Sequence, residues 1–314
     1  MSLGLGMAAI GRPHYINVRT NTIAKSNVIE LKANGFKVLD EAYNLGVRYF
    51  DTAPGYGLAE NLLIDWLVSK HDKNIEVATK WGYTYTANFD ANALIHEVKE
   101  HSVSKLKAQW QVSKKLLPFL TTYQIHSATL DTGVLENKAV LNELAYLKSE
   151  YHLKMGISTT GENQVEVIKK ALDVMVENKP LFDTFQSTYN VLDQSILEVS
   201  ALLIQENKKL IIKEALANGR IFKNKNYPEY VTFYNILEKL SHKYQVGFDA
   251  IALQFCEKTI PESMVLSGAS TVMQLQENLK MNAFCLSEDE LNTLNSFKVT
   301  PANYWHERKQ LKWN

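Results

Sequence analysis

The segment that decides the fold begins Val47-Arg48-Tyr49-Phe50-Asp51-Thr52-Ala53-Pro54-Gly55-Tyr56-Gly57 and ends Ile75-Glu76-Val77-Ala78-Thr79-Lys80. Its two apolar runs have the length of strands, and each ends abruptly in an ionisable residue, Asp51 in the first and Lys80 in the second. The residues between them, 59–68, have the spacing of a helix. Tyr56 lies between two glycines in the loop after the first run. An Asp, a Tyr and a Lys placed in this way form a candidate proton-transfer group.

The same alternation of strand and helix extends over the rest of the chain. The predicted strands are Leu3 to Ile10, Val47 to Phe50, Ile75 to Thr79, Thr121 to His126, Leu153 to Ser158, Phe182 to Ser187, Lys209 to Glu214 and Met264 to Gly268. The predicted helices are one capped by Asn27 and ended by Gly46, then Ala59 to Val68, Ala91 to about Leu117, Lys138 to Lys148, Gln164 to Val176, Ser195 to Glu206, Val231 to Tyr244, Phe248 to Lys258, Val272 to Asn282 and Glu288 to Ser296. Eight strands, each followed by helix, predict an α/β fold of the (β/α)8 TIM-barrel type, and a doubly wound open sheet is the alternative.

The N-terminal residues Gly4-Leu5-Gly6-Met7-Ala8-Ala9 formally match the dinucleotide-binding pattern GxGxxA. That motif needs a strand before it and a helix directly after it, whereas nothing precedes this one and Gly11-Arg12-Pro13 follows. We therefore interpret residues 3–10 as the first strand, whose glycines let a neighbouring backbone approach closely.

Composition points to a small-molecule partner. The chain has 314 residues, 46 % of them hydrophobic, and its 34 basic and 34 acidic residues balance. The chain can therefore bury a large core, and its balanced charge gives no electrostatic reason to bind nucleic acid or an anionic membrane. Cys256 and Cys285 are the only cysteines, and no apolar run reaches the roughly 18 residues of a membrane span, so a soluble cytoplasmic protein is expected. The oligomeric state is not indicated.

No linker, low-complexity segment or shift in composition divides the chain. We therefore expect one domain over residues 1–314, with an aromatic tail from about residue 297 that includes Tyr304, Trp305 and Trp313. Two placements of this tail are open: it covers the mouth of the barrel as a lid, or it docks on the barrel side.

Polar residues stand at the end of nearly every predicted strand. They are Asp51 with the nearby Tyr56, Lys80, His126, Ser158, Gln186, Lys213 with Glu214, and Ser267 with Gly268. In a barrel the carboxyl ends of all strands meet at one mouth, where enzymes of this fold carry their active sites. Each residue alone has a structural alternative, such as a turn cap for Asp51, a solvent-reaching chain for Lys80 or a core histidine for His126. The case for a site therefore depends on the whole set.

This set resembles the aldo-keto reductase family. The stretch from Gly46 to Glu60 is similar to the signature around that family's catalytic Asp and Tyr. The sequence Ala78-Thr79-Lys80-Trp81-Gly82 resembles its lysine strand, and Tyr123-Gln124-Ile125-His126 its histidine strand. The resemblance covers nearly the whole chain and implies an NAD(P)H-dependent enzyme that interconverts a carbonyl, in an aldehyde, ketone or sugar, and an alcohol.

The resemblance implies a role for each of the four residues. Tyr56 is the general acid that protonates the carbonyl oxygen during reduction, Lys80 lowers the pKa of that phenol, Asp51 orients Lys80, and His126 positions the carbonyl. An ammonium about 4 Å away stabilises a phenolate by roughly 4 kcal/mol at an effective dielectric of about 20, which is worth about 3 pK units.

The same resemblance assigns cofactor contacts. Ser158 and Gln186 match positions that bind the nicotinamide carboxamide, but Thr159 replaces a common Asn, and Lys213 stands where an aromatic residue often stacks. The adenosine end is assigned to Gly268, Ala269, Ser270, Gln274, Glu277 and Asn278. Gly268 and Gln274 replace the basic residues that many members use for the 2′-phosphate, so NADP(H) is the implied cofactor and NAD(H) stays an alternative.

Other functional classes stay open at this stage. A nicotinamide-nucleotide-binding regulatory subunit on the same barrel, with little turnover, is compatible with an intact catalytic set. A glycosidase would need two facing carboxylates, for which the strand ends offer only Asp51 and Glu214. A metal-dependent isomerase would need clustered ligands, whereas the eight histidines are scattered and no metal is expected.

Overall fold

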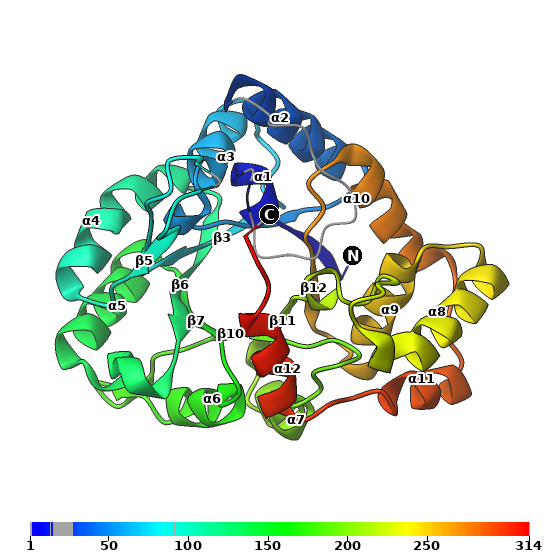
Figure 1. The fold of residues 1–314 in the computed structure, drawn as a ribbon. Helices are drawn as coiled ribbons and strands as arrows, with labels where there is room; N and C mark the ends of the chain where they lie inside the picture. The colour runs from blue at the N-terminus through cyan, green and yellow to red at the C-terminus, as the bar shows by residue number, and fades with distance from the viewer. Residues whose placement is uncertain (1, 13, 15–27, 91, 314) are drawn as a thin grey trace.

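The computed structural model describes residues 2–12, 14, 28–90 and 92–313. Within these residues, eight parallel strands close into a barrel in the order β1-β12-β11-β10-β7-β6-β3-β2, seen along its axis in Figure 1. The barrel strands are β1 (Leu3–Gly6), β2 (Tyr49–Asp51), β3 (Glu76–Trp81), β6 (Leu120–Ala128), β7 (Lys154–Thr159), β10 (Thr184–Thr188), β11 (Lys209–Lys213) and β12 (Met264–Ser267). The predicted (β/α)8 barrel is confirmed, and the open sheet is excluded.

Helices surround the barrel (Figure 1). They are α1 (Ala8–Gly11), α2 (Val28–Asn44), α3 (Ala59–Leu67), α4 (Val103–Ser113), α5 (Lys138–Tyr151), α6 (Gln164–Leu172), α7 (Leu197–Gln205), α8 (Val231–Tyr244), α9 (Phe248–Thr259), α10 (Val272–Leu279), α11 (Glu288–Asn295) and α12 (Pro301–Lys309). Several begin at side-chain caps: Asn137 caps α5, and Ser287 with Glu290 forms a capping box on α11. None of the described helices has the length and apolar content needed to cross a bilayer.

Two side-chain layers follow from the alternation along each strand. Inward residues from four strands form a small apolar cluster inside the barrel, comprising Tyr49, Ala78, Ile211 and Leu266. Gly4 makes room for this cluster, because a Cβ atom there would lie 2.8 Å from Cδ1 of Tyr49. The predicted close approach of a neighbouring backbone is confirmed at Gly4, because the same Cβ atom would lie 3.2 Å from the carbonyl oxygen of Tyr49.

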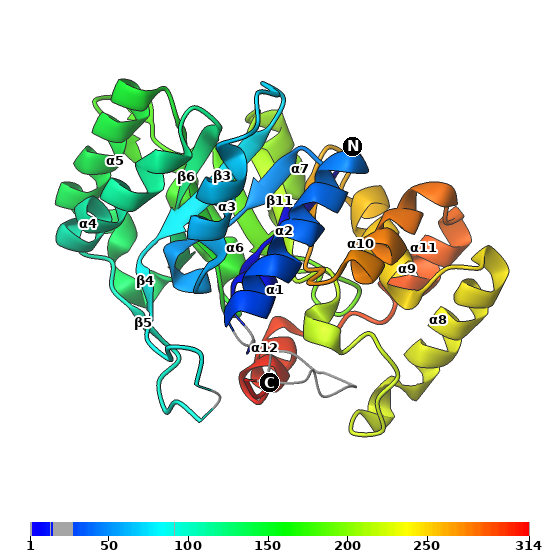
Figure 2. The same ribbon diagram turned by 90° about the horizontal axis from the view of Figure 1, so that it is seen from above.

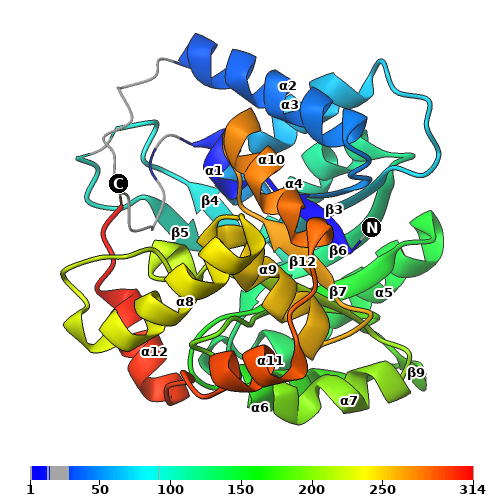
Figure 3. The same ribbon diagram turned by 90° about the vertical axis from the view of Figure 1, so that its right-hand side faces the viewer.

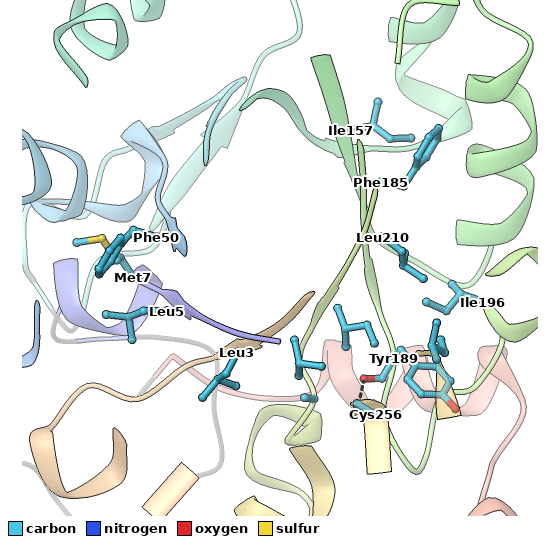
Figure 4. Close-up of a cluster of buried hydrophobic side chains, with 14 of the residues drawn as sticks. Leu3, Leu5, Met7, Phe50, Ile157, Phe185, Tyr189, Ile196, Leu210 and Cys256 are labelled. Atoms are coloured by element: carbon cyan, nitrogen blue, oxygen red, sulfur yellow. Dashed lines mark hydrogen bonds between the residues drawn. The ribbon is translucent and has the colours of Figure 1, made fainter. Parts of the chain in front are cut away.

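The larger hydrophobic core lies between the barrel and the helices. Figure 4 shows part of it, with Leu5 and Phe50 from β1 and β2 and Phe185 and Leu210 from β10 and β11. Each of these side chains is almost fully buried, and such burial contributes roughly 1.5–3 kcal/mol per side chain. The core thus fixes the strands in register and holds their polar carboxyl ends in place.

The structure corrects three predicted elements. The helix expected over residues 91–117 is wrong except for α4, because an antiparallel hairpin of β4 (Tyr83–Tyr85) and β5 (Glu97–Lys99) precedes it. The first strand ends at Gly6, and residues 8–11 form one helical turn. Helix α6 ends at Leu172, after which β8 (Met175–Val176) pairs with β9 (Lys179–Pro180). The predicted cap at Asn27 lies outside the described residues.

The C-terminal tail lies across the mouth of the barrel. Figures 1 and 2 place α12 over the rim of the barrel near β10 and β11, at the end of the molecule where the β4–β5 hairpin also lies, and the chain after α12 runs across the centre of the barrel. Figure 3 shows the same end from the side, with α12 and the hairpin both on the left and the N-terminus on the right. Tyr304 and Trp305 of α12 are buried. Of the two placements expected for the tail, the lid is therefore the one observed.

Candidate active site

The interior of the barrel holds a buried ion pair. Asp51 is the last residue of β2, and Lys80 is an inward residue of the neighbouring β3. The Lys80 ammonium contacts one carboxylate oxygen of Asp51 and donates to the carbonyl of Thr52 at 3.2 Å. Both side chains are buried: the exposed fraction is 0 % for Lys80 and 3 % for Asp51. A buried ammonium requires such a counter-ion, because removing one partner of a buried pair leaves an uncompensated charge and is strongly destabilising.

The second oxygen of Asp51 is held by two amides. Gln186 of β10 donates to it from Nε2 at 2.8 Å, and Gln124 of β6 donates from Nε2 at 3.4 Å. Gln186 is a residue for which the family resemblance implies a nicotinamide contact. In this structure its amide instead fixes the carboxylate that orients Lys80.

Tyr56 and His126 lie together at the mouth, above this pair. Tyr56 ends a short 3-10 helix, Pro54–Tyr56, and His126 is an inward residue of β6. The Tyr56 hydroxyl is 3.4 Å from Nε2 of His126, and the two rings meet edge to face with centroids 5.3 Å apart. Nζ of Lys80 lies 5.0 Å from the centre of the Tyr56 ring. The structure thus brings Asp51, Tyr56, Lys80 and His126 into one group, as the strand placement predicts.

The electrostatics of Tyr56 differ from the expectation drawn from its neighbour Lys80. Burial, and then the negative charge of Asp51, raise the pKa of the Tyr56 phenol well above 10.0, against the opposing charge of Arg12. The expected lowering fails here mainly because the phenol is buried, and also because the negative charge of Asp51, which pairs with Lys80, lies close to the phenol. Tyr56 is consequently a protonated phenol, which is the form that a proton donor requires.

His126 is held neutral. Burial, followed by the positive charges of Lys80 and Arg12, lowers the pKa of its imidazole well below 6.5. With the ring proton on Nε2, a neutral imidazole donates a hydrogen bond into the mouth without carrying a charge. The ring of Tyr83 packs edge to face on His126, at 4.7 Å between centroids, and helps to fix its orientation.

Two other residues near strand ends make contacts around this group. Ser158 of β7 accepts a hydrogen bond from the backbone N–H of Ser127 at 2.8 Å. Lys213, the last residue of β11, donates to the Thr188 hydroxyl at 3.1 Å. Ser158 and Lys213 therefore both lie at the mouth, one on each side of β10.

Glu214 connects β11 to the tail. One of its carboxylate oxygens accepts two hydrogen bonds from the Arg308 guanidinium of α12, at 3.1 and 2.9 Å. Burial acts to raise the pKa of this carboxyl, but the charges of Arg308 and Lys213 outweigh it and hold the pKa at about 2. Glu214 is therefore ionised and serves as an anchor for α12.

The segment assigned to the adenosine end lies between β12 and α10. Gly268 is exposed, and a Cβ atom there would meet no atom within 4 Å. The backbone N–H and hydroxyl of Ser270 both donate to Oε1 of Gln274, at 2.9 and 3.2 Å. The backbone N–H of Ala269 donates to the Ser267 hydroxyl at 3.2 Å.

Two residues of α10 face in different directions. Glu277 is only partly buried and pairs with Lys280 one helical turn later, at 2.6 Å. Asn278 is buried and hydrogen-bonds the Ser267 hydroxyl at 2.7 Å, so it ties α10 to β12. The structure thus leaves Glu277 accessible and places Asn278 under the segment rather than on its surface.

Sequence reasoning missed several residues at the mouth. Arg12 is buried, donates to the carbonyl of Gly55 at 3.1 Å, and pairs with Glu97 at 2.8 Å. Its guanidinium lies 5.3 Å from the centre of the Tyr56 ring and 4.8 Å from that of Trp313. No local pattern marks Arg12. The β-forming residues Tyr83-Thr84-Tyr85 were the signal that could have revealed the hairpin, whose Glu97 pairs with Arg12.

A second carboxyl, Glu60 of α3, lies behind Lys80 on the helix-facing side of β3. It is 3 % exposed and accepts hydrogen bonds from the hydroxyls of Thr79 at 2.6 Å and Ser113 at 2.9 Å. Burial raises its pKa from 4.5 to about 7, although both hydroxyls and the charge of Lys80 oppose the change. Glu60 is therefore the one described carboxyl beside the site that is placed to change its charge near neutrality.

A parallel eight-stranded barrel with Asp51, Tyr56, Lys80 and His126 at its mouth is typical of an enzyme, and comparison with known proteins identifies the family. The model of the aldo/keto reductase family matches residues 2–298. An uncharacterized oxidoreductase of Bacillus subtilis, YqkF, is 25 % identical over 292 residues, which is 84 % of this chain and 88 % of that protein. The NADH-specific methylglyoxal reductase of Escherichia coli is 21 % identical over 76 % of this chain and 79 % of its own length.

Solved structures agree in fold. The aldo-keto reductase AKR11C1 of Bacillus halodurans superposes with a TM-score of 0.69 at 22 % identity, over 95 % of this chain and 92 % of that one. The chain belongs to the aldo/keto reductase family, a family of oxidoreductases that use nicotinamide cofactors. Helix α12 lies beyond the residues that the family model matches.

Proposed function

We propose that the protein is an NAD(P)H-dependent oxidoreductase that interconverts a carbonyl and an alcohol, with Tyr56 as its general acid and base. The observation that carries this proposal is the 3.4 Å contact between the Tyr56 hydroxyl and Nε2 of His126, directly beside the buried pair of Lys80 and Asp51. A carbonyl oxygen placed between these two groups would meet a proton donor and a second hydrogen-bond donor at once.

Tyr56 gives its proton from the phenol oxygen to the carbonyl oxygen during reduction and takes it back during alcohol oxidation. Its raised pKa keeps the proton in place until the carbonyl oxygen gains negative charge. Lys80 then stabilises the phenolate that remains, and Asp51 orients Lys80. His126 donates from Nε2 and orients the carbonyl.

The loop at the start of α10 suits a phosphate. Two donors of Ser270 converge on one acceptor oxygen, Oε1 of Gln274, in the way that donors converge on a phosphate oxygen. An oxygen of the cofactor's phosphate can take the place of that amide oxygen without a side-chain charge. Gly268, Ala269 and Ser270 would supply this contact.

The remaining assigned residues would hold the rest of the cofactor. Ser158 and Lys213 would bind the nicotinamide end, and Glu277 the adenine. Gln186 and Asn278 reach the cofactor only by exchanging the hydrogen bonds that they make to Asp51 and Ser267. A nicotinamide bound beside Tyr56 supplies the hydride.

The choice between NADP(H) and NAD(H) depends on the 2′-phosphate. NADP(H) is the cofactor that the family resemblance implies, but residues 268–274 contain no Lys or Arg to pair with that phosphate. A relative in Escherichia coli is named as NADH-specific. We therefore propose that both nucleotides bind and that the 2′-phosphate adds little affinity.

The substrate is proposed to be a small aldehyde, ketone or sugar, and the setting the cytoplasm, because Cys256 and Cys285 are both free thiols. Fluorescence titration with NADH and NADPH, followed by a panel of carbonyl compounds monitored at the nicotinamide absorbance, tests the function. Binding with turnover supports it. Absence of binding refutes it, and tight binding without turnover of any carbonyl favours the regulatory-subunit alternative.

A further inference from the structure

The β4–β5 hairpin forms one wall of the mouth. Its antiparallel register pairs Tyr83 with Lys99 and Tyr85 with Glu97, so these four side chains share one face of the hairpin. Tyr83 packs on His126, and Glu97 pairs with Arg12 beside Tyr56. The face that carries Lys99 is therefore the face turned toward the candidate active site.

The ring of Tyr83 lies between Lys99 and His126. Its ammonium is 5.6 Å from the centre of the Tyr83 ring, and that ring is 4.7 Å from the His126 ring. Nζ of Lys99 donates to the backbone carbonyl of Ser127, the residue after His126, at 2.9 Å. A group that contacts this ammonium would thus be about a ring's width from the proposed position of the carbonyl.

The ammonium of Lys99 has no carboxylate in contact with it in the part of the chain that the structure describes. Three other cations of the site each contact a carboxylate: Lys80 with Asp51, Arg12 with Glu97, and Arg308 with Glu214. Lys213 donates to the Thr188 hydroxyl and lies on the other side of β10, in the part of the mouth proposed to bind the nicotinamide. For Lys99, no carboxylate in the described residues comes within ion-pair distance. Burial lowers the pKa of its ammonium, and Asp131 and Glu97 oppose this only from a distance.

A partly buried ammonium with a single neutral acceptor is a site for an anion, because a bound anion would offset its loss of hydration. We propose that Lys99 binds a carboxylate of the substrate, so that the preferred substrates are carbonyl compounds with an acid group about one aromatic ring away from the carbonyl. This proposal rests on the proposed function, since it assigns the substrate class of the same site.

The alternative role for Lys99 is structural, as a tie between the hairpin and the Ser127 carbonyl. The two roles differ in one measurable way. A structural tie affects all substrates alike, whereas an anion-binding residue affects only those that carry the acid group.

The test compares 4-carboxybenzaldehyde with its neutral methyl ester, methyl 4-formylbenzoate, in the full chain with cofactor. We expect the native protein to prefer the acid in kcat/KM. The K99M variant should lose that preference by about tenfold to a hundredfold, through a higher KM for the acid rather than a lower kcat. The K99R variant should retain most of it.

A matched control is K105M. Lys105 also hydrogen-bonds the hairpin, at the Thr84 hydroxyl, but from its other face, and pairs with Glu100. The ratio of the two substrates should not change in this variant. An equal fall for both substrates in K99M, or no preference for the acid in the native protein, overturns the proposal.

Failure of the proposed function is a separate outcome. If neither aldehyde is turned over, calorimetric binding of 4-carboxybenzaldehyde still decides the role of Lys99. Weaker binding in K99M than in the native protein supports the acid site, and unchanged binding overturns it.

Discussion

The buried carboxyl of Glu60 makes the stability of the protein depend on pH. Its folded-state pKa of about 7 exceeds the ordinary value of 4.5, so the folded protein holds this proton more tightly than the unfolded chain. Stability from this group is therefore complete below about pH 4.5 and is lost as the pH rises through about 7. At about 1.4 kcal/mol per pH unit, this difference is worth about 3 kcal/mol.

Replacing Glu60 with Gln removes that dependence. The amide keeps an oxygen that accepts from Thr79 and Ser113, but it has no charge to bury. We expect the unfolding free energy of Glu60→Gln, relative to the native protein, to rise by about 3 kcal/mol between about pH 4 and pH 9. Urea denaturation followed by tryptophan fluorescence at a series of pH values measures this difference.

The matched control is Glu162→Gln, the same change at an exposed residue before α6, which should follow the native protein at every pH. A difference between Glu60→Gln and the native protein that stays constant across the pH range would refute the reasoning. It would mean that folding does not change the pKa of Glu60.

Three further predictions concern the ion pairs and the cofactor loop. Asp51→Asn leaves the Lys80 ammonium buried without a counter-charge, so chemical denaturation should show that the unfolding free energy falls by about 3 kcal/mol or more. Adding Lys80→Met should restore most of this stability. A double variant that is no more stable than Asp51→Asn contradicts the prediction. The pKa of Glu214 is lowered to about 2, so its pairing with Arg308 contributes stability above about pH 4.5 that is lost as the pH falls toward 2. Glu214→Gln should therefore increase amide hydrogen exchange in α12 at neutral pH. Unchanged exchange would contradict the role of Glu214 as an anchor for α12. Gly268→Lys adds a cation at a position where a Cβ atom would meet no other atom within 4 Å. We expect kcat/KM with NADPH to rise by about tenfold and kcat/KM with NADH to stay the same. No gain with NADPH would mean that the 2′-phosphate binds elsewhere.

Much of the architecture was predictable because periodicity reflects burial. Alternating strand and helix patterns predicted eight strands, and the polar residues at the ends of seven of them could be assigned to the mouth once the barrel was inferred. Asp51 and Lys80 end up in contact because both point inward from neighbouring parallel strands, Lys80 two residues beyond Ala78, which is the register partner of Asp51.

The parts that were not predictable depend on tertiary contacts. The segment before α4 was expected to be helical, whereas its β-forming residues pair as a hairpin that packs on His126 and Arg12. No sequence pattern shows that the tail crosses the mouth, since Arg308 reaches Glu214 only in the folded chain. The pKa of Tyr56 likewise depends on burial and on Asp51, which spacing along the chain does not reveal.

The central claim is that Tyr56 transfers the proton, and Tyr56→Phe tests it most directly. The change removes one hydroxyl and keeps the ring that packs on His126. With the best carbonyl substrate from the panel, kcat should fall by about a thousandfold, within the range for loss of a general acid, while the Kd for NADH, measured by fluorescence, stays within about a factor of two. Turnover retained to within about tenfold of the native rate, with NADH binding unchanged, would contradict the account.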